Sequence, residues 1–186
     1  MSFRAFISMD VGVHPKIVGF SQELRRYGSS LKVVDPNIIH LTLKFLGETD
    51  EALIPRIREA MEKSVDGVAP ISVRFKGVGA FPSMSRIRVI WIGLEGGENM
   101  SLIARRLDDE LSILGFKREE RPFMPHITLA RTREGGSAGF ARELLEISGN
   151  EEFGEQLMDT LRLKKSVLSP KGPTYSIVEE VRLSDV

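Results

Sequence analysis

The stretch Pro36-Asn-Ile-Ile-His40-Leu-Thr42-Leu43 has a second copy later in the chain, Pro122-Phe-Met-Pro-His126-Ile-Thr128-Leu129. The two stretches align without a gap, and their histidines lie 86 residues apart (126 − 40 = 86). The chain has 186 residues and only three histidines, so two of the three occupy equivalent places in a repeat. This repeat indicates a duplicated fold, in which each half supplies one His-x-Thr-Leu tetrad.

Each tetrad has the pattern of a β-strand with two chemically different faces. Side chains two residues apart on a strand point to the same face. His40 and Thr42 therefore share one face, while Leu41 and Leu43 point to the opposite, apolar face. The second tetrad repeats this division, so each half is expected to offer one imidazole and one hydroxyl on a polar face.

The same alternation gives three further predictions. Lys44 has the parity of His40 and is expected on the histidine face. Phe45 has the opposite parity and is expected to pack in the core. Arg131 is expected on the face opposite His126, although its long side chain at a strand end can bend toward an anion.

The rest of the sequence alternates between strand and helix patterns. Apolar residues at helical spacing predict helices at residues 14–27, 50–65, 99–114 and 140–147. Short apolar or alternating runs predict strands at residues 3–9, 31–34, 38–46, 71–78, 87–94, 126–131, 157–168 and 174–183. Residues 79–85 are expected to form a loop. This order is typical of an α+β protein with antiparallel sheets and helices outside.

The composition restricts the class of protein. The 26 Lys and Arg residues balance 26 Asp and Glu residues, which argues against a coat for long nucleic acid but permits a short anionic ligand. The absence of cysteine excludes disulfides and thiolate chemistry. No apolar run approaches the ~18 residues that span a bilayer, so we expect a cytoplasmic protein with no membrane partner. Asn and Gln are scarce, which is typical of thermophile proteins. No broad apolar surface stripe is apparent, so a monomer is expected.

Two histidine and threonine pairs suit displacement at phosphorus. Imidazole titrates near neutrality, so one ring can start as a base and the other as an acid. No metal and no cofactor are expected, because no His-Asp-Glu cluster or Cys pair has ligand spacing. A Gly-x-Ser-x-Gly elbow and a phosphate-binding loop are also absent. His14 lacks a threonine partner and is expected to be structural.

Several segments together resemble one family. They are residues 4–7, 40–47, 88–91, 123–131, 166–168 and 172–175. In this order they are similar to the 2H phosphoesterase superfamily, and within it to the RNA 2′,3′-cyclic phosphodiesterase family, also called 2′-5′ RNA ligase. The resemblance implies a bilobal, pseudo-twofold domain over residues 1–186, made of two intertwined lobes whose antiparallel sheets line a central cleft.

The resemblance also implies an activity and its residues. RNA ends with a 2′,3′-cyclic phosphate, including tRNA halves, would be hydrolysed to 2′-phosphomonoesters, with 2′-5′ ligation as the reverse reaction and no obligate protein partner. His40 would be the general acid, and His126 the general base. Thr42 and Thr128 would hold the phosphate oxygens. The acid and base labels rest on the resemblance alone, because the sequence repeat is symmetric.

Other residues have weaker support, and two rival functions stay open. Lys44, Arg131 and Tyr175 are candidate substrate contacts; Lys44 can equally be solvated, and Arg131 can equally form a structural ion pair. Four cations are candidates for guiding an RNA backbone: Arg86, Arg88, Lys164 and Lys165. The rivals are a noncatalytic module that binds RNA ends and a phosphodiesterase for another small cyclic phosphate.

Overall fold

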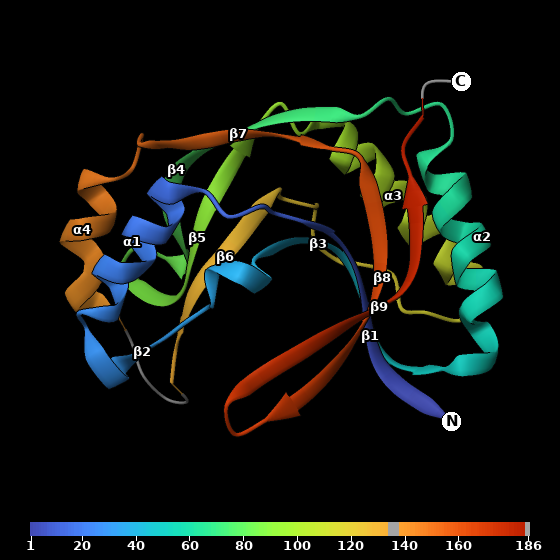
Figure 1. The fold of residues 1–186 in the computed structure, drawn as a ribbon, viewed down its shortest axis with the longest axis horizontal. Coiled ribbons are helices and arrows are strands. Elements are labelled where there is room, and N and C mark those ends of the chain that lie inside the picture. The colour runs from blue at the N-terminus through green and yellow to red at the C-terminus, as the bar shows by residue number, and fades with distance from the viewer. Residues whose placement is uncertain (134–137, 185–186) are drawn as a thin grey trace.

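The computed structural model describes residues 1–133 and 138–184 (Figure 1). Its strands are β1 (Ser2–Asp10), β2 (Leu31–Val33), β3 (His40–Asp50), β4 (Ile71–Ser83), β5 (Arg86–Glu95), β6 (His126–Thr132), β7 (Glu152–Met158), β8 (Thr160–Ser169) and β9 (Gly172–Arg182). Its α-helices are α1 (Pro15–Arg25), α2 (Ile54–Val65), α3 (Glu98–Ile113) and α4 (Arg142–Ile147). The short 3-10 helices are η1 (Gly28–Ser30), η2 (Pro36–Ile38), η3 (Glu51–Leu53) and η4 (Gly139–Ala141).

The strands form two antiparallel sheets with matching strand order. The four-stranded sheet has the order β3-β1-β8-β9, and the five-stranded sheet has the order β2-β6-β5-β4-β7. With β2 set aside, the tetrad strands β3 and β6 occupy equivalent places, and β1 corresponds to β5. Each sheet takes strands from both halves of the chain, which confirms the predicted α+β architecture with two antiparallel sheets.

Helices cover one face of each sheet. Helices α2 and α3 contact the four-stranded sheet, and α1 and α4 contact the five-stranded sheet. Figure 1 shows these pairs at opposite ends of the molecule with the sheets between them. Helix α2 illustrates the cause, because Ile57, Ala60 and Met61 form a buried stripe at helical spacing. Each sheet thus has an outer face under helices and an inner face turned away from them. No described helix has the length and apolar character needed to cross a membrane.

Two strand predictions are wrong in extent. The predicted loop at residues 79–85 is mostly strand, because β4 continues to Ser83 and pairs with β5 almost to the turn. Gly79 suggested a loop, but here it makes room for the ring of Trp91, its cross-strand partner. The predicted strand at residues 157–168 corresponds mainly to β8, and the separate edge strand β7 was not predicted. Strand β7 contains Glu152, Gly154 and Glu155, and both residue types are depleted in strands.

Both tetrad strands contain a β-bulge directly after the threonine. The extra residue is Leu43 in β3 and Leu129 in β6, at equivalent places in the repeat. Two consecutive residues are buried at each bulge, Leu43 with Lys44 and Leu129 with Ala130. A bulge adds one residue to the strand, so it reverses the alternation of side chains beyond it.

This reversal overturns three predictions made from simple alternation. Lys44 is buried in an ion pair with a residue of α3, which packs on the outer face, so its prediction as a substrate contact is wrong. Phe45, predicted to pack in the core, is 63% exposed. Arg131, predicted on the face opposite His126, is exposed, and its charge acts on both tetrad histidines. Phe45 and Arg131 therefore belong to the inner faces.

Candidate active site

The two tetrad histidines are held by the same backbone hydrogen bond. In His40, Nδ1 lies 2.9 Å from the carbonyl oxygen of Ile38, and in His126 it lies 2.7 Å from that of Met124. A carbonyl oxygen only accepts, so Nδ1 carries the hydrogen of this bond and Nε2 is the nitrogen that can exchange a proton. The repeat thus assigns the same tautomer to both neutral rings.

A capped turn fixes the carbonyl that holds His40. Asp35 caps η2, and its Oδ1 accepts a hydrogen bond of 2.9 Å from the amide of Asn37. This hydrogen bond is the main cause that holds the pKa of the Asp35 carboxyl below its ordinary value. Pro36 stands in the first turn, where its fixed φ suits the start of a helix. The turn therefore sets Ile38 before strand β3 begins.

Aromatic rings flank both histidines. The ring centroid of His40 lies 4.9 Å from that of Phe6 and 5.2 Å from that of Tyr175. The ring of His126 stands edge-on to Phe81 at 5.1 Å. Both histidines are half-buried as a result. Tyr175, a predicted substrate contact, is also half-buried and stands beside His40.

Burial lowers the pKa of both histidines. Desolvation is the largest cause at His40 and at His126, and in each case the hydrogen bond to the carbonyl opposes it. The positive charge of Arg131 lowers the pKa of both rings further. One guanidinium thus acts on both imidazoles, and their strands β3 and β6 are in contact, so the two rings share one environment. Both rings therefore favour the neutral form.

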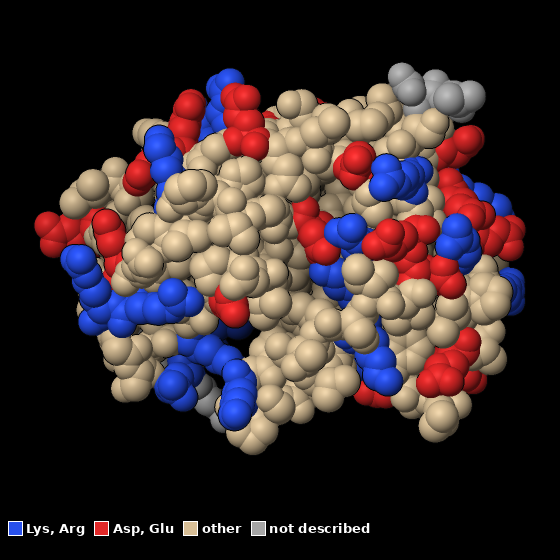
Figure 2. All heavy atoms as spheres, viewed as in Figure 1, with Lys and Arg blue, Asp and Glu red and all other residues tan. Residues whose placement is uncertain are grey.

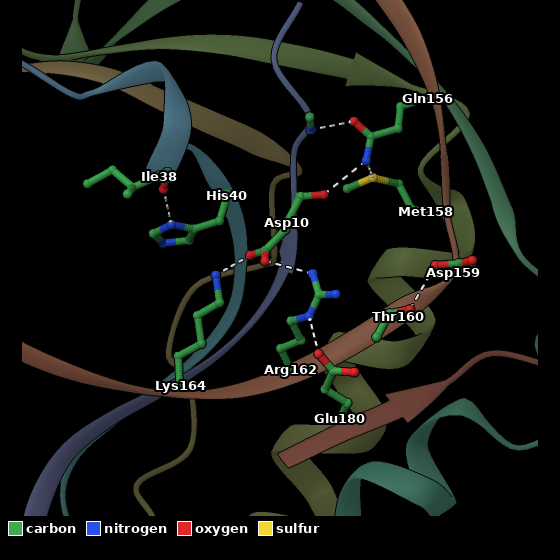
Figure 3. A network of polar contacts seen from close by, with 11 residues as sticks. Asp10, Ile38, His40, Gln156, Met158, Asp159, Thr160, Arg162, Lys164 and Glu180 are labelled. Atoms are coloured by element: carbon green, nitrogen blue, oxygen red, sulfur yellow. Dashed lines mark hydrogen bonds and ion pairs between the residues drawn. The ribbon is translucent and has the colours of Figure 1, made fainter. Parts of the chain in front are cut away.

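Asp10 organises a network of charges beside His40 (Figure 3). It is the cross-strand neighbour of His40, and its carboxylate accepts hydrogen bonds from Arg162, at 2.7 Å, and from Lys164. Gln156 of β7 donates to the Asp10 carbonyl at 2.9 Å and so ties β1 to the other sheet. Lys164 is buried in this network. The prediction that Lys164 guides an RNA backbone is therefore wrong, because its side chain is buried and its ammonium group is held by Asp10.

Two more predicted positions lie away from the inner faces. The Nζ atom of Lys165 stands 5.9 Å from the ring centroid of Phe3, a core residue, so Lys165 is poorly placed to guide a ligand to the histidines. His14 hydrogen-bonds through Nε2 to Gln156 at 3.1 Å and packs edge-on against Phe75. These contacts agree with a structural role for His14.

The threonines of the tetrads have unusual cross-strand neighbours. Thr42 pairs with Ser8, and Thr128 pairs with Trp91. Among the described residues, the Ser8 hydroxyl and the Trp91 indole nitrogen are buried without a hydrogen-bond partner. Sequence analysis missed these residues because their relation to the tetrads arises only from strand pairing. The same is true of Asp10.

An uncompensated basic row crosses the five-stranded sheet. Lys32 of β2 is the cross-strand partner of Arg131. On the other side, Val89 of β5 pairs with Arg131. Arg88 precedes Val89 and is the extra residue of another bulge. Within the described ranges, none of these three exposed cations has an acidic partner in an ion pair. We call Lys32, Arg88 and Arg131 the basic row. In the view of Figure 2, Lys and Arg side chains border a hollow in the lower part of the molecule. Arg86 lies at the exposed hairpin end.

Metal ligands are not grouped in this site. Over residues 1–133 and 138–184, no three His, Cys, Asp or Glu side chains are arranged to hold a metal ion. The polar groups near the tetrads are imidazoles, hydroxyls and cations, and the one nearby carboxylate, Asp10, is engaged by Lys164 and Arg162. This donor set suits an anionic ligand better than a cation.

Comparison with known proteins gives concordant results. The profile of the 2′-5′ RNA ligase superfamily matches residues 13–163. A protein of Methanothermobacter thermautotrophicus named RNA 2′,3′-cyclic phosphodiesterase is 34% identical over 185 residues, which cover 98% of this chain and 100% of that protein. A protein of Thermotoga maritima with the same name is 32% identical over 181 residues, covering 95% and 94% of the two chains. Such thermophilic sources agree with the composition.

Solved structures share the fold. The crystal structure of TT0787 of Thermus thermophilus aligns with a TM-score of 0.81 and 28% identity, covering 97% of each chain. The structure of Escherichia coli LigT complexed with 3′-AMP aligns with a TM-score of 0.74 and 20% identity over 99% of each chain. The second likeness concerns the fold alone.

Proposed function

This chain belongs to the 2′-5′ RNA ligase superfamily, and we propose that it hydrolyses the 2′,3′-cyclic phosphate at the end of an RNA to a 2′-phosphomonoester. Relatives named RNA 2′,3′-cyclic phosphodiesterase, similar over nearly the full chain, support this reaction class. The observation that carries the proposal for this molecule is the pair of histidines with matching carbonyl hydrogen bonds at Nδ1, which leave both Nε2 atoms for proton transfer.

The proposed mechanism is general acid and base catalysis by His40 and His126. Nε2 of His126 takes a proton from water, and the water oxygen forms a bond to phosphorus. The bond from phosphorus to the 3′ oxygen breaks, and His40 donates its Nε2 proton to that oxygen. The product carries a 2′-phosphate and a 3′-hydroxyl, and solvent then restores the starting protonation states. No metal ion is needed to activate the water, because His126 does so.

Fixed donors would stabilise the charge that develops on the phosphate. The hydroxyls of Thr42 and Thr128 are two residues from the rings on the same strands and can donate to nonbridging oxygens. Arg131 adds a full positive charge that acts on both rings. Preorganised donors of this kind lower the barrier because they need no reorientation during the reaction. The same groups permit 2′-5′ ligation, a parallel transesterification in which a 5′-hydroxyl takes the place of water, the bond from phosphorus to the 3′ oxygen breaks and a 2′-5′ bond forms.

RNA beyond the cyclic phosphate would lie along the basic row. Lys32 and Arg88 extend from Arg131 across neighbouring strands and have no acidic partner among the described residues, so they can neutralise backbone phosphates. The exposed ring of Phe45 and the ring of Tyr175 are candidates for stacking on bases. A small cyclic nucleotide would contact the histidines but not the basic row. Changes in the basic row would therefore affect RNA and leave the small substrate unaffected, which distinguishes the two alternatives.

One incubation tests the reaction class. The purified protein is mixed with a 2′,3′-cyclic nucleotide in excess chelator, and the position of phosphate on the product is identified. We expect a 2′-phosphate, formed at the same rate with and without chelator. A 3′-phosphate would contradict the assignment of the leaving oxygen, and binding without turnover would favour a noncatalytic RNA-end module. Competition between an oligonucleotide and a mononucleotide then separates RNA from a small cyclic phosphate.

A further inference from the structure

Lys44 is a buried cation that joins the strand of His40 to the segment that leads to His126. Its side chain is 1% exposed, and its Nζ lies 2.7 Å from Asp108 Oδ1, 2.6 Å from the carbonyl oxygen of Lys117 and 3.3 Å from Glu119 Oε1. A lysine has three donors, so this set satisfies it fully. A charge buried this deeply requires such partners.

The three acceptors come from two parts of the chain. Asp108 belongs to α3, while Lys117 and Glu119 belong to the segment of residues 114–125 that connects α3 to β6. Asp108 Oδ1 also accepts a hydrogen bond of 3.0 Å from the amide of Glu119. The connecting segment is therefore attached twice directly to Lys44, through Lys117 and Glu119, and once to the carboxylate of Asp108.

The position of Lys44 in its own strand is set by the repeat. The bulge at Leu43 turns Lys44 to the outer face, so its side chain reaches α3 while His40 and Thr42 stay on the inner face. The counterpart of Lys44 in the second tetrad is Ala130, which makes no polar contact of this kind. The attachment therefore has no equivalent at the second tetrad. It joins the strand of the first tetrad to the segment that leads into the second.

The electrostatics of Asp108 fit this attachment. Burial alone would raise the pKa of the Asp108 carboxyl, but the hydrogen bonds from Lys44 and from the Glu119 amide hold it below its ordinary value. Asp108 therefore carries its negative charge at neutral pH. An ion pair that is buried, charged and also bonded to a backbone carbonyl restricts its segment far more than an exposed pair does.

We propose that Lys44 is a positioning residue, which sets the place of His126 relative to His40 by fastening the segment before β6 to strand β3. The proposal rests on the proposed two-histidine function. Residue 119 precedes His126 by only seven positions, and the intervening Pro122 and Pro125 limit the freedom of the chain. Release of the segment would let the carbonyl of Met124 shift, and with it the ring that it holds.

The test compares two lysine variants. Lys44→Met removes the charge and keeps the length of the side chain. Lys63→Met is the matched control. Lys63 of α2 also pairs with an acidic residue of α3, Glu110, and with Glu59 of its own helix, but its side chain is 55% exposed and it lies far from the connecting segment in the chain. Hydrogen exchange of residues 114–126, thermal unfolding and steady-state hydrolysis of a 2′,3′-cyclic nucleotide are measured for both.

We expect Lys44→Met to speed hydrogen exchange in residues 114–126 and to lower kcat about tenfold to a hundredfold, because small displacements of a catalytic group have effects of this order. KM should change less than about threefold, since each ring still meets the phosphate. Affinity for a nucleoside–vanadate complex, which needs both rings at once, should fall by a factor similar to that of kcat, while product affinity stays near wild type. Lys63→Met should match wild type in all of these.

Several outcomes would overturn the proposal. If hydrogen exchange in residues 114–126 is unchanged in Lys44→Met, the proposal is overturned, whatever the activity of the variant. It is also overturned if folded Lys44→Met protein has the kcat and the vanadate affinity of wild type. If Lys44→Met does not fold, Glu119→Gln takes its place, because it weakens the direct tether and keeps the Lys44–Asp108 pair; wild-type exchange and kcat in that variant would overturn the proposal. Failure of the wild-type protein to hydrolyse the cyclic phosphate would instead contradict the proposed function, and the exchange experiment would still judge the attachment.

Discussion

Phe45 and Arg131 occupy equivalent positions in the two tetrad strands, each two residues beyond a bulge and each exposed. The duplicated backbone thus presents an aromatic ring from one strand and a guanidinium from the other. The neighbours of the histidines differ in the same way. Asp10 lies opposite His40, whereas Gly93 lies opposite His126. The fold is nearly symmetric, but the chemistry around its two imidazoles is not, and this difference suits the distinct acid and base roles proposed for them.

Replacement of Arg131 tests its place at the site. Arg131→Met removes a cation whose charge reaches both histidines, so we expect weaker binding of a nucleoside 2′-phosphate by about tenfold to a hundredfold, as for hydrogen bonds to charged groups. The pKa values of both rings should rise, because a charge that lowers them is gone. Arg56→Met, on the exposed side of α2, is the control for a lost surface cation. Unchanged product affinity would remove Arg131 from the site.

Alanine at either tetrad histidine should abolish most of the activity. A positioned acid or base contributes ~10² to 10⁴ in rate, or roughly 2.7 to 5.5 kcal/mol of barrier. We therefore expect His40→Ala and His126→Ala each to lose at least about a hundredfold in kcat. His14→Ala should lose stability, because its bond to Gln156 disappears, but should keep the turnover of its folded fraction. A tetrad variant with near wild-type kcat would exclude that histidine from the mechanism.

The pH dependence should be bell-shaped, with its maximum of kcat/KM on the acid side of 6.5. This parameter reports the free protein, in which burial lowers the pKa of both His40 and His126 from the ordinary value of 6.5. A lowered pKa means that the ring serving as acid loses its proton at lower pH, so the descending limb also begins there. A bound phosphate favours the charged imidazole, so the maximum of kcat should lie at higher pH. A kcat/KM maximum above 6.5 would contradict the burial argument.

The basic row should strengthen the binding of oligonucleotides but not of mononucleotides. For a single strand, a plot of the logarithm of the binding constant against the logarithm of the salt concentration has a negative slope of about 0.7 per neutralised phosphate. Lys32→Met should reduce this slope by about that amount for an oligonucleotide with a cyclic end, while KM for a cyclic mononucleotide stays within about twofold. Arg105→Met on α3 serves as the control. Equal slopes in both variants would mean that RNA takes another path.

The tetrads and the α+β class could be predicted from the sequence. The face of the sheet to which the residues beyond each threonine point could not. Two-residue alternation placed His40 and Thr42 together because no bulge precedes them. It failed at Lys44 and Phe45 because a bulge depends on how the neighbouring strand pairs. Lys164 was misjudged for a related reason. Its partner, Asp10, lies 154 residues away in sequence and meets it only through the pairing of β1 with β8.

Gly79 packs so closely against Trp91 that the added methyl group of an alanine should disturb the aromatic rings beside His126. A Cβ atom at Gly79 would lie 2.2 Å from Cζ2 of the Trp91 ring, which also stacks on Phe81, the neighbour of His126. Gly79→Ala must therefore displace the indole, and overpacking of this kind costs about 1 to 3 kcal/mol. Thermal unfolding should show this loss, with a fall in kcat as the aromatic wall shifts. Gly19→Ala in α1 is the matched control, because nothing lies within 4 Å of its Cβ and alanine favours the helix by about 1 kcal/mol. Equal stability changes in the two variants would show that Trp91 moves aside freely and does not support the ring of His126.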